Sequence, residues 1–478
     1  MTDSTETDVV VVGGGPCGST VATLVAKQGH RVVQLEKERF PRYQIGESLL
    51  PSTVQGICRL LGVSRELEEA GFPVKRGGTF RWGANPEPWT FAFGISPKFA
   101  GSASTAYQVE RMRFDQILLD NARKHGVDVR EEHAVSDVIT SEEGRVCGVI
   151  ATDATGARRE FRCRYVVDAS GHGSRIHSRV GGKRQYSEFF RNLALFGYFT
   201  GGKRMPAPRQ GNILAVAFNS GWFWYIPLSD ELTSVGAVLL PEALDRVQGD
   251  RERALRELIA ECPMIADFLA DAERVTSGPY GEIRVRKDYS YIQEKFWRPG
   301  LVLAGDAACF IDPVFSSGVH LATYGGLLAA RSVNTALLTA ADPDEATLFE
   351  EFELRYRQEY ARFHDFLVAF YDMHSDEQSY FWKAKKVTGN AASEIQSFVD
   401  LVGGGSSDER ALVDVGSYLD RRDRGLDELA WSVAEAGARI QMQAATGGTA
   451  DEQVPVRPGG LVPSPDGMHW SVPSPAAA

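Results

Sequence analysis

A run of four valines followed at once by a glycine-rich turn constrains the fold of this chain more than any other feature. Residues 9–12 are all valine, which favours a short buried strand in a parallel sheet. The turn Gly-Gly-Gly-Pro-Cys-Gly occupies residues 13–18, and a predicted helix at 19–27 and a second strand at 31–36, ending in Glu36, follow it. This order of strand, glycine turn, helix, strand and acid is the fingerprint of a dinucleotide-binding fold. We therefore predict an α/β chain with a Rossmann-like domain.

Each part of this motif has a physical role in holding a dinucleotide. Glycines let the backbone approach a pyrophosphate, and the N-terminus of the following helix offers free N–H groups and a partial positive charge. An acid at the end of the second strand accepts hydrogen bonds from the adenosine ribose and disfavours the 2′-phosphate of NADP, so FAD or NAD is expected. A glycine-rich turn without a ligand is the alternative. The candidate cofactor-binding residues of this motif are Gly13, Gly15, Pro16, Gly18 and Glu36.

Two later segments favour FAD over NAD. Residues 165–168 and 301–304 are apolar strands that each run into a small, glycine-containing turn. Both are expected in the same sheet as residues 9–12, which places Asp306 at the ligand-binding edge. A carboxylate there can hold the ribityl hydroxyls of a flavin, a contact that NAD does not need. FAD is therefore the predicted cofactor.

The charge balance and the spacing of cysteines and histidines exclude several other classes of protein. Among 478 residues, 52 Lys and Arg against 63 Asp and Glu give a net charge of −11, which argues against a nucleic-acid binder. The acidic start does not resemble a signal peptide, and no stretch of about 18 apolar residues follows, so we expect a cytoplasmic protein with no membrane span. Six cysteines form no CxxC pair and nine histidines show no metal-ligand spacing, so no metal site is predicted.

These flavin motifs resemble those of the FAD-dependent aromatic hydroxylase class. That class carries a glycine-rich turn, an Asp-Gly-type segment, here at 168–171, and a Gly-Asp segment, here at 305–306. Residues 109–118 match its V-x-R-x-x-F-D-x-x-L pattern, and the resemblance implies that Arg111 contacts the flavin. A surface arginine at the start of a helix is the alternative for this residue.

Within this class, the chain resembles the reduced-flavin-dependent halogenases from about residue 7 to about residue 385. Four stretches carry the resemblance, at residues 45–51, 75–83, 222–227 and 312–318. The third is the family's W-x-W-x-I-P signature, formed by Trp222, Trp224, Ile226 and Pro227.

The signature stretch is predicted to be an extended strand. Trp222, Trp224 and Ile226 then share one face, and Phe223 and Tyr225 share the other. The resemblance implies that the first face walls off the space beside the flavin, so that the organic substrate is not hydroxylated directly. Simple burial within a sheet is the alternative.

The last of the four stretches precedes a predicted helix at 319–338. Ser316 is expected to be its N-cap, which leaves the N–H groups of Ser317 and Gly318 pointing out of the helix start as an anion site. The resemblance places the halide, expected to be chloride, at Ser317 and Gly318 beside the flavin ring. A capped helix whose amides face water is the alternative.

The residue before this serine pair separates branches of the halogenase family. In the free-tryptophan branch that residue is glutamate, whereas here it is Phe315. This departure argues against free tryptophan as the substrate and favours the phenol or pyrrole branch. Residues 371–382 also resemble the phenol-type halogenases.

Lys75 is the predicted catalytic residue. A Lys-Arg pair before two glycines is usually a solvated turn, but Lys75 stands upstream of Gly77, Phe80 and Trp82, as in the family's lysine segment. The resemblance implies that a flavin hydroperoxide and chloride give hypochlorous acid. Lys75 would then polarise this acid or become a haloamine, and both modes stay open. Burial would lower the pKa of the amine and favour its neutral form.

The chain is expected to divide into a flavin-binding core and a helical region. The core spans residues 1–340, with segments at about 75–110 and 185–285 forming a sheet that roofs the flavin. Residues 341–445 are predicted to be helical, and 446–478, rich in proline and glycine, to be a flexible tail. Seven aromatic residues recur at helical spacing between positions 349 and 370, which indicates core packing or, alternatively, a docking groove.

The sequence therefore predicts a flavin-dependent halogenase that chlorinates a phenolic or similarly activated aromatic ring in secondary metabolism. It would need dioxygen, chloride and reduced FAD from a separate flavin reductase. The aromatic substrate could be free or tethered to an acyl or peptidyl carrier protein. An FAD-dependent aromatic hydroxylase is the alternative enzyme, and a flavin-binding docking protein without turnover is the alternative from another class. An isoprenoid reductase fits poorly with the complete signature.

Overall fold

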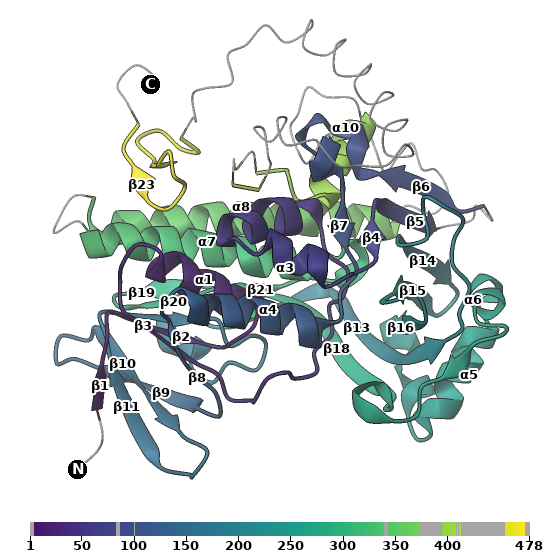
Figure 1. Ribbon diagram of the computed structural model, residues 1–478, viewed down its shortest axis with the longest axis horizontal. Helices are drawn as coiled ribbons and strands as arrows, with labels where there is room; N and C mark the ends of the chain where they lie inside the picture. The colour runs from purple at the N-terminus through teal and green to yellow at the C-terminus, as the bar shows by residue number, and fades with distance from the viewer. Residues whose placement is uncertain are drawn as a thin grey trace, which may run out of the picture.

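The structure is a computed structural model that describes residues 4–82, 87–99, 101–338, 343–372, 394–407, 409, 411–412 and 455–473. A parallel sheet lies beneath the long helices α7 (Ser317–Leu338) and α8 (Glu345–Asp372), and a nine-stranded sheet packs beside them (Figure 1). Among the described residues, no helix is long and apolar enough to cross a membrane and no cluster of side chains could hold a metal ion.

The run of four valines is a buried inner strand of a six-stranded sheet. All neighbouring strands are parallel except the outermost pair, and all four valines are buried. Because parallel strands end at the same edge, the turns that follow them meet there, which confirms the Rossmann-like fold. In order across the sheet, the strands are β19 (Trp297–Arg298), β20 (Leu301–Leu303), β12 (Tyr165–Asp168), β2 (Val9–Val12), β3 (Val32–Leu35) and β8 (Asp128–Arg130).

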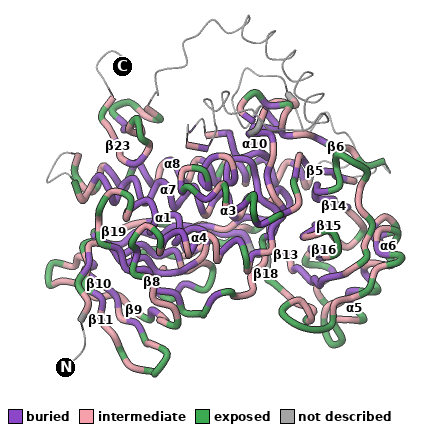
Figure 2. Tube along the Cα trace, viewed as in Figure 1, coloured by how far each residue is buried: buried purple, intermediate pink, exposed green. Residues whose placement is uncertain are grey.

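Helices cover this sheet and fix its glycine turn in place. Helix α1 (Pro16–Ala26) packs against α7 and against α4 (Arg111–Lys124), and α8 packs on α7. Burial is deepest where these helices meet the parallel strands (Figure 2). The shorter helices are the π-helical η1 (Ser52–Cys58), α2 (Arg59–Leu61), α3 (Ser64–Glu69), α5 (Arg251–Ala260), α6 (Pro263–Phe268) and α10 (Glu394–Val402).

The nine-stranded sheet contains strands from both segments predicted to roof the flavin. In order, its strands are β21 (Cys309–Phe310), β18 (Arg284–Gln293), β13 (Arg184–Thr200), β16 (Leu232–Leu239), β15 (Gly221–Pro227), β14 (Ile213–Phe218), β5 (Gly77–Arg81) and β6 (Trp89–Ala92), with β17 (Glu273–Arg274) paired to β13. The predicted alternation along β15 is confirmed. Trp222, Trp224 and Ile226 belong to the main core, whereas Phe223 and Tyr225 belong to a second core that includes residues of α5 and α6.

Smaller elements complete the described chain. A four-stranded sheet contains, in order, β1 (Ser4–Glu6), β11 (Arg158–Arg162), β10 (Val146–Thr152) and β9 (Ala134–Thr140), and β4 (Val74–Lys75) pairs with β7 (Ala106–Tyr107). The 3₁₀ helices are η2 (Phe93–Ile95), η3 (Pro97–Phe99), η4 (Gly101–Ser104), η5 (His177–Val180), η6 (Pro241–Val247), η7 (Gly278–Tyr280), η8 (Gly305–Ala307) and η9 (Pro313–Phe315).

The aromatic residues of α8 pack into the core. All seven are at most 7% exposed, which confirms core packing. Helices α8 and α10 lie within the region predicted to be helical, and residues 373–393 and 413–445 of that region lie outside the described residues. The seven residues are Phe349, Phe352, Tyr356, Tyr360, Phe363, Phe366 and Phe370.

Part of the predicted flexible tail is a packed hairpin, which corrects that expectation for residues 455–473. Strands β22 (Val462–Pro463) and β23 (Trp470–Ser471) pair with each other. The Trp470 ring lies 4.7 Å from the Arg331 guanidinium, and its indole N–H donates to Ser332 Oγ at 2.8 Å. One large aromatic side chain therefore anchors a segment whose proline and glycine content alone predicted no structure.

Replacing this anchor should destabilise the fold. Trp470→Ala removes a side chain that is 4% exposed, and we expect the free energy of unfolding to fall by about 3 kcal/mol. Urea denaturation measures the change. Val472→Ala is the matched control, because Val472 lies two residues further along and is 69% exposed, so its loss should cost less than about 0.5 kcal/mol. Equal stability of both variants would contradict the anchoring role.

Candidate functional site

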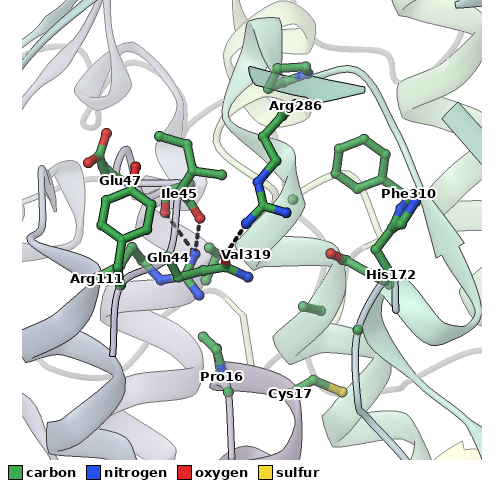
Figure 3. A pocket seen from close by; sticks show the side chains of 18 of the residues that line it. Pro16, Cys17, Gln44, Ile45, Glu47, Arg111, His172, Arg286, Phe310 and Val319 are labelled. Carbon is green, nitrogen blue, oxygen red and sulfur yellow. Dashed lines mark hydrogen bonds between the residues drawn. The ribbon is translucent and has the colours of Figure 1, made fainter. Parts of the chain in front are cut away.

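A pocket of about 630 Å³ opens at the edge where the parallel strands end. Its lining joins the turn after β2, the loop at 42–48, the start of α4, the turn after β12 and strands of the nine-stranded sheet. Figure 3 shows Pro16 and Cys17 on one side of this space and Arg286, His172 and Phe310 on another. Segments that are far apart in the sequence therefore meet around one cavity.

The glycine turn approaches neighbouring backbone too closely for any side chain. Gly13 has φ +108°, and a Cβ there would lie 2.4 Å from the carbonyl oxygen of Ala169. A Cβ on Gly18 would lie 2.0 Å from the Gly13 carbonyl oxygen. Gly15, the N-cap of α1, offers no side-chain hydrogen bond to the first turn of the helix. The pocket thus has a bare, partly positive helix end, which suits a pyrophosphate.

The acid after β3 lies beside this turn. One oxygen of Glu36 accepts a hydrogen bond from the Gly14 N–H at 2.6 Å, and the other accepts one from the Glu38 N–H at 2.8 Å. Glu36 also lines the pocket. Two backbone donors therefore fix the carboxylate in an orientation that a ribose can reach.

Arg111 lies at the start of α4 and is buried, so the surface alternative for this residue is wrong. Its guanidinium pairs with Asp115 at 2.7 Å and donates to the carbonyl oxygens of Ile45 and Gly46. Burial raises the pKa of Asp306 to about 6, although the positive charge of Arg111 opposes this effect. Both residues line the pocket.

Three residues of the tryptophan signature form one wall of the pocket. Trp222, Trp224 and Ile226 line it, while Pro227 ends β15 beyond the lining. The Trp222 indole N–H donates to Tyr371 Oη at 2.6 Å, and the Trp224 indole N–H donates to Ser234 Oγ at 3.1 Å. These hydrogen bonds hold both rings in place, so the wall is rigid.

The start of α7 differs in detail from the sequence prediction. The helix begins at Ser317, and Ser316 has φ +61°, a left-handed conformation in place of the extended backbone of an N-cap. The reason is that η9 ends at Phe315 and the chain must reverse before α7 can begin. The side chain of Asp312 caps η9, because it accepts from the Val314 N–H.

The residues predicted to bind halide lie at the pocket wall. Gly318 lines the pocket, and a Cβ added to it would meet no atom within 4 Å. Ser317 lies directly behind the lining, and its hydroxyl is buried without a hydrogen-bond partner among the described residues. A small anion could therefore meet first-turn amides and an uncommitted hydroxyl here.

Lys75 is buried, with 2% of its surface exposed. Its Nζ donates to the Leu49 carbonyl oxygen at 2.9 Å and lies 5.5 Å from the centre of the Phe93 ring. Burial lowers the pKa of this amine from 10.5 to about 7, so much of it is neutral at physiological pH. A solvated turn, the alternative for this residue, is therefore wrong.

A chain of aromatic contacts connects Lys75 to the pocket wall. Lys75 is not part of the lining, which reaches Ser48, one residue before the carbonyl that holds the amine. Successive ring centres, 4.7 to 6.2 Å apart, lead from the ring beside Lys75 to the tryptophan wall. The rings in this chain are Phe93, Phe91, Phe398, Phe315, Phe370, Trp82 and Trp222.

The structure also brings together residues to which the sequence assigned no role. Glu47 lines the pocket and accepts a hydrogen bond from Tyr198 Oη at 2.8 Å, and Tyr198 Oη lies 2.6 Å from Tyr43 Oη. Arg286 donates to Gln44 Oε1 at 3.2 Å across the pocket in Figure 3. No motif marks these residues, apart from the Gly-Glu-Ser stretch that contains Glu47.

Histidines near the flavin motifs have structural partners. His320 is fully buried and lies 2.9 Å from both Ser52 Oγ and Glu359 Oε1. His177 lies 2.7 Å from the side-chain amide nitrogen of Gln293. His172 lines the pocket, and its ring packs edge-on against Tyr291. His320 and His177 are therefore held by neighbouring side chains, whereas His172 belongs to the pocket wall.

Comparisons with known proteins agree with this geometry. The family model described as tryptophan halogenase matches residues 8–103 and 96–446. Tryptophan 2-halogenase of Chondromyces crocatus is 36% identical over 383 residues, which cover 80% of this chain and 71% of that protein. The structure of the myxobacterial chondrochloren halogenase CndH, a variant of the FAD-dependent halogenases, is 51% identical with a TM-score of 0.77 over 98% of this chain and 100% of that chain. The flavin-dependent halogenase CmlS is 30% identical with a TM-score of 0.74, over 98% and 84% of the two chains.

Proposed function

Because the chain belongs to the flavin-dependent halogenase family, we propose that it chlorinates an electron-rich, phenolic aromatic ring in secondary-metabolite biosynthesis. Enzymes of this family use FAD, generally need a separate flavin reductase, and typically take chloride as the halide. Bound reduced FAD with dioxygen supplies the oxidant that converts chloride to hypochlorous acid. The chain's own residues must then hold the flavin, place the halide and direct the oxidant to the substrate.

The residues of the pocket fit FAD. The bare end of α1 suits the pyrophosphate: Gly13, Gly15 and Pro16 line the pocket there, whereas Gly18 lies behind the lining and allows the turn to pack closely on Gly13. Glu36 is positioned for the ribose, and Asp306 and Arg111 face the pocket, where they can hold the ribityl chain and the flavin ring. The Trp222, Trp224 and Ile226 wall closes the side of this space and separates the organic substrate from the flavin oxidant.

Lys75 is the residue to which we assign delivery of the oxidant. This assignment rests on the environment of the amine. The amine is buried, donates to one backbone carbonyl oxygen and lies close to an aromatic ring, rather than being solvated. Because its pKa is near 7, the ammonium form can donate a hydrogen bond to hypochlorous acid, and the amine form can accept chlorine. Both modes place the reactive chlorine at the far end of the aromatic chain from the flavin.

An aromatic substrate suits the surroundings of Lys75. Phe315 stands where the free-tryptophan branch carries glutamate, and aromatic rings connect Lys75 to the pocket wall. A phenol pairs favourably with such rings through stacked and edge-to-face contacts. We further propose that the substrate is presented by an acyl or peptidyl carrier protein.

Product mass tests this function. The enzyme is mixed with anaerobically reduced FAD, then with dioxygen, chloride and candidate phenols, either free or attached to a carrier protein, with tryptophan as a separate arm. We expect a phenol to gain one chlorine, with its isotope pattern, and tryptophan to remain unchanged. Added oxygen without chlorine would support the hydroxylase instead, and chlorinated tryptophan would contradict the phenolic substrate.

The chloride site gives a separate prediction. In Gly318→Ala the new methyl group meets no protein atom, so the fold tolerates it, but it projects into the space that we assign to the halide. We expect the KM for chloride to rise at least about tenfold, as for one misplaced methyl group in a fitted pocket, and the melting temperature to be unchanged. Halide titration with mass detection measures the change, and FAD affinity is the internal control. An unchanged KM for chloride would contradict the site.

A further inference from the structure

Oxidation of chloride consumes a proton in the flavin compartment, and none of the roles assigned above supplies it. Chloride enters as an anion and leaves as the neutral acid HOCl, and the balance is FADH₂ + O₂ + Cl⁻ + H⁺ → FAD + HOCl + H₂O. One proton must therefore enter the compartment for each chloride oxidised. This inference rests on the proposed halogenation and concerns the source of that proton.

Glu47 is placed to hold such a proton. It lines the pocket but is 2% exposed, and it follows Ile45 and Gly46, whose carbonyl oxygens accept from Arg111. One carboxyl oxygen accepts from Tyr198 Oη at 2.8 Å, and the Ser234 hydroxyl, which itself accepts from the Trp224 indole N–H, is a second hydrogen-bond donor toward the carboxyl group. The carboxyl group is therefore buried among hydroxyl groups at the pocket wall, where it can take up and release a proton.

A short chain of hydroxyl groups leads from Glu47 to the outer part of the pocket. Tyr198 has a single hydroxyl proton and donates it to Glu47, so Tyr43 must donate in the 2.6 Å hydrogen bond between the two phenols. Tyr43 lines the pocket and is only partly buried, whereas Tyr198 is fully buried. The directed chain Tyr43–Tyr198–Glu47 can pass a proton inward, one hydrogen bond at a time.

The other three carboxyl groups that line the pocket have different hydrogen-bond partners or are exposed. Both oxygens of Glu36 accept backbone N–H groups, and Glu38 is exposed. Asp306 lies in η8 next to the glycine turn, where it suits the ribityl chain. Among these four, Glu47 is the one that lies at the end of a chain of hydroxyl groups.

We propose that Glu47 holds the proton consumed in each halide oxidation and is reloaded through Tyr198 and Tyr43. The proton moves from the carboxyl group to the reacting oxygen in the pocket and leaves a carboxylate. Tyr198 then gives its hydroxyl proton to that carboxylate, and Tyr43 gives its own to Tyr198. Tyr43 recovers a proton from water at the pocket mouth.

The surroundings of Glu47 support this role. Burial raises the pKa of its carboxyl group to about 7, and the charge of Glu110 acts in the same direction, whereas the hydrogen bonds from Ser234 and Tyr198 and the charge of Arg111 oppose the increase. The Tyr43, Tyr198 and Tyr280 phenols are the other titratable groups nearby, and the pKa of each is raised, so they stay protonated at neutral pH. Glu47 can therefore both hold and release a proton near pH 7.

The test combines two variants with a matched control. Glu47→Gln keeps the shape but cannot carry the proton, and Tyr198→Phe interrupts the chain. Tyr280→Phe is the control, because Tyr280 packs on Tyr198 but donates to Glu110, outside the chain. Hypochlorous acid is measured with a diffusible β-diketone trap, so that delivery by Lys75 does not enter the measurement.

We expect Glu47→Gln to form hypochlorous acid about 10²-fold more slowly, to release hydrogen peroxide instead, and to bind FAD within about threefold of the parent protein. In the parent protein the rate should fall as pH rises through about 7, where Glu47 loses its proton, and this dependence should be absent in Glu47→Gln. Tyr198→Phe should be slowed about tenfold, and Tyr280→Phe should match the parent protein.

A second measurement, made on the protein without flavin, detects the proton on Glu47. The infrared spectrum of the apoprotein should show a carboxylic acid band that disappears as pH rises through about 7 and that Glu47→Gln lacks. The proposal would be overturned if Glu47→Gln formed hypochlorous acid at the parent rate and with the parent pH dependence. Equal slowing of Tyr198→Phe and Tyr280→Phe would also overturn it. Failure of the proposed Lys75 role is distinguishable, because the trap reports the formation of hypochlorous acid, a step that precedes delivery by Lys75.

Discussion

Lys75→Met is expected to abolish chlorination of the substrate, with a fall of at least about 10³-fold in the rate of product formation, while FAD binding is unchanged. The reason is that methionine fills the same buried space but offers neither an N–H donor nor a nucleophilic nitrogen. The amine is 2% exposed and donates a hydrogen bond to the Leu49 carbonyl oxygen. Single-turnover experiments with reduced FAD and mass detection measure the rate, and FAD titration serves as the control.

The pH dependence of stability, compared between the parent protein and the same variant, tests whether the amine is buried. With a folded pKa near 7 and an ordinary value of 10.5, the unfolded chain binds a proton on Lys75 between these pH values that the folded chain does not. Stability of the parent protein should therefore rise with pH across this window relative to Lys75→Met. Denaturation at pH 7 and pH 10 measures the difference, and an identical pH dependence for both proteins would contradict burial of the amine.

Gly13→Ala is expected to eliminate FAD binding. The new Cβ would lie 2.4 Å from the Ala169 carbonyl oxygen at a position with φ +108°, so β12 or the glycine turn must shift by about an ångström. Either shift disturbs both the pyrophosphate cradle and the turn beside it. We expect the dissociation constant for FAD to rise at least about 10³-fold, measured by flavin fluorescence titration.

A second glycine separates the clash from backbone strain. Gly29 also has positive φ, +84°, but a Cβ there meets no atom within 4 Å. Gly29→Ala should therefore cost about 1 kcal/mol of stability from strain alone and leave FAD binding intact. Loss of FAD from both variants would show that backbone strain rather than the close approach is responsible, and retention by Gly13→Ala would contradict the assigned cradle.

Local patterns in the sequence were sufficient to predict which segments meet in the half of the pocket that we assign to the flavin. The valine run, the glycine turn and the acid at position 36 are contiguous, and parallel pairing of their strands follows from chain order. Alternation in the tryptophan signature likewise decides which rings face the pocket, because the period of a strand is two. These predictions depend on neighbours in sequence, which is why they could be made without a structure.

Features that depend on distant partners could not be predicted in this way. Glu47 and Tyr198 are 151 residues apart and meet only because β13 packs against the loop at 42–48. The hairpin at 455–473 is held by Trp470 against Arg331, which a composition rich in proline and glycine does not reveal. The left-handed Ser316 depends on η9, a short turn that no periodicity marks.

One measurement tests most directly whether the oxidant formed in the pocket is delivered by Lys75. Lys75→Met is mixed with anaerobically reduced FAD, dioxygen and chloride, in the presence of both the phenolic substrate and a diffusible trap for hypochlorous acid. We predict chlorinated trap in parent-like yield and no chlorinated substrate. Substrate chlorinated at the parent rate and at the same ring position would contradict the account.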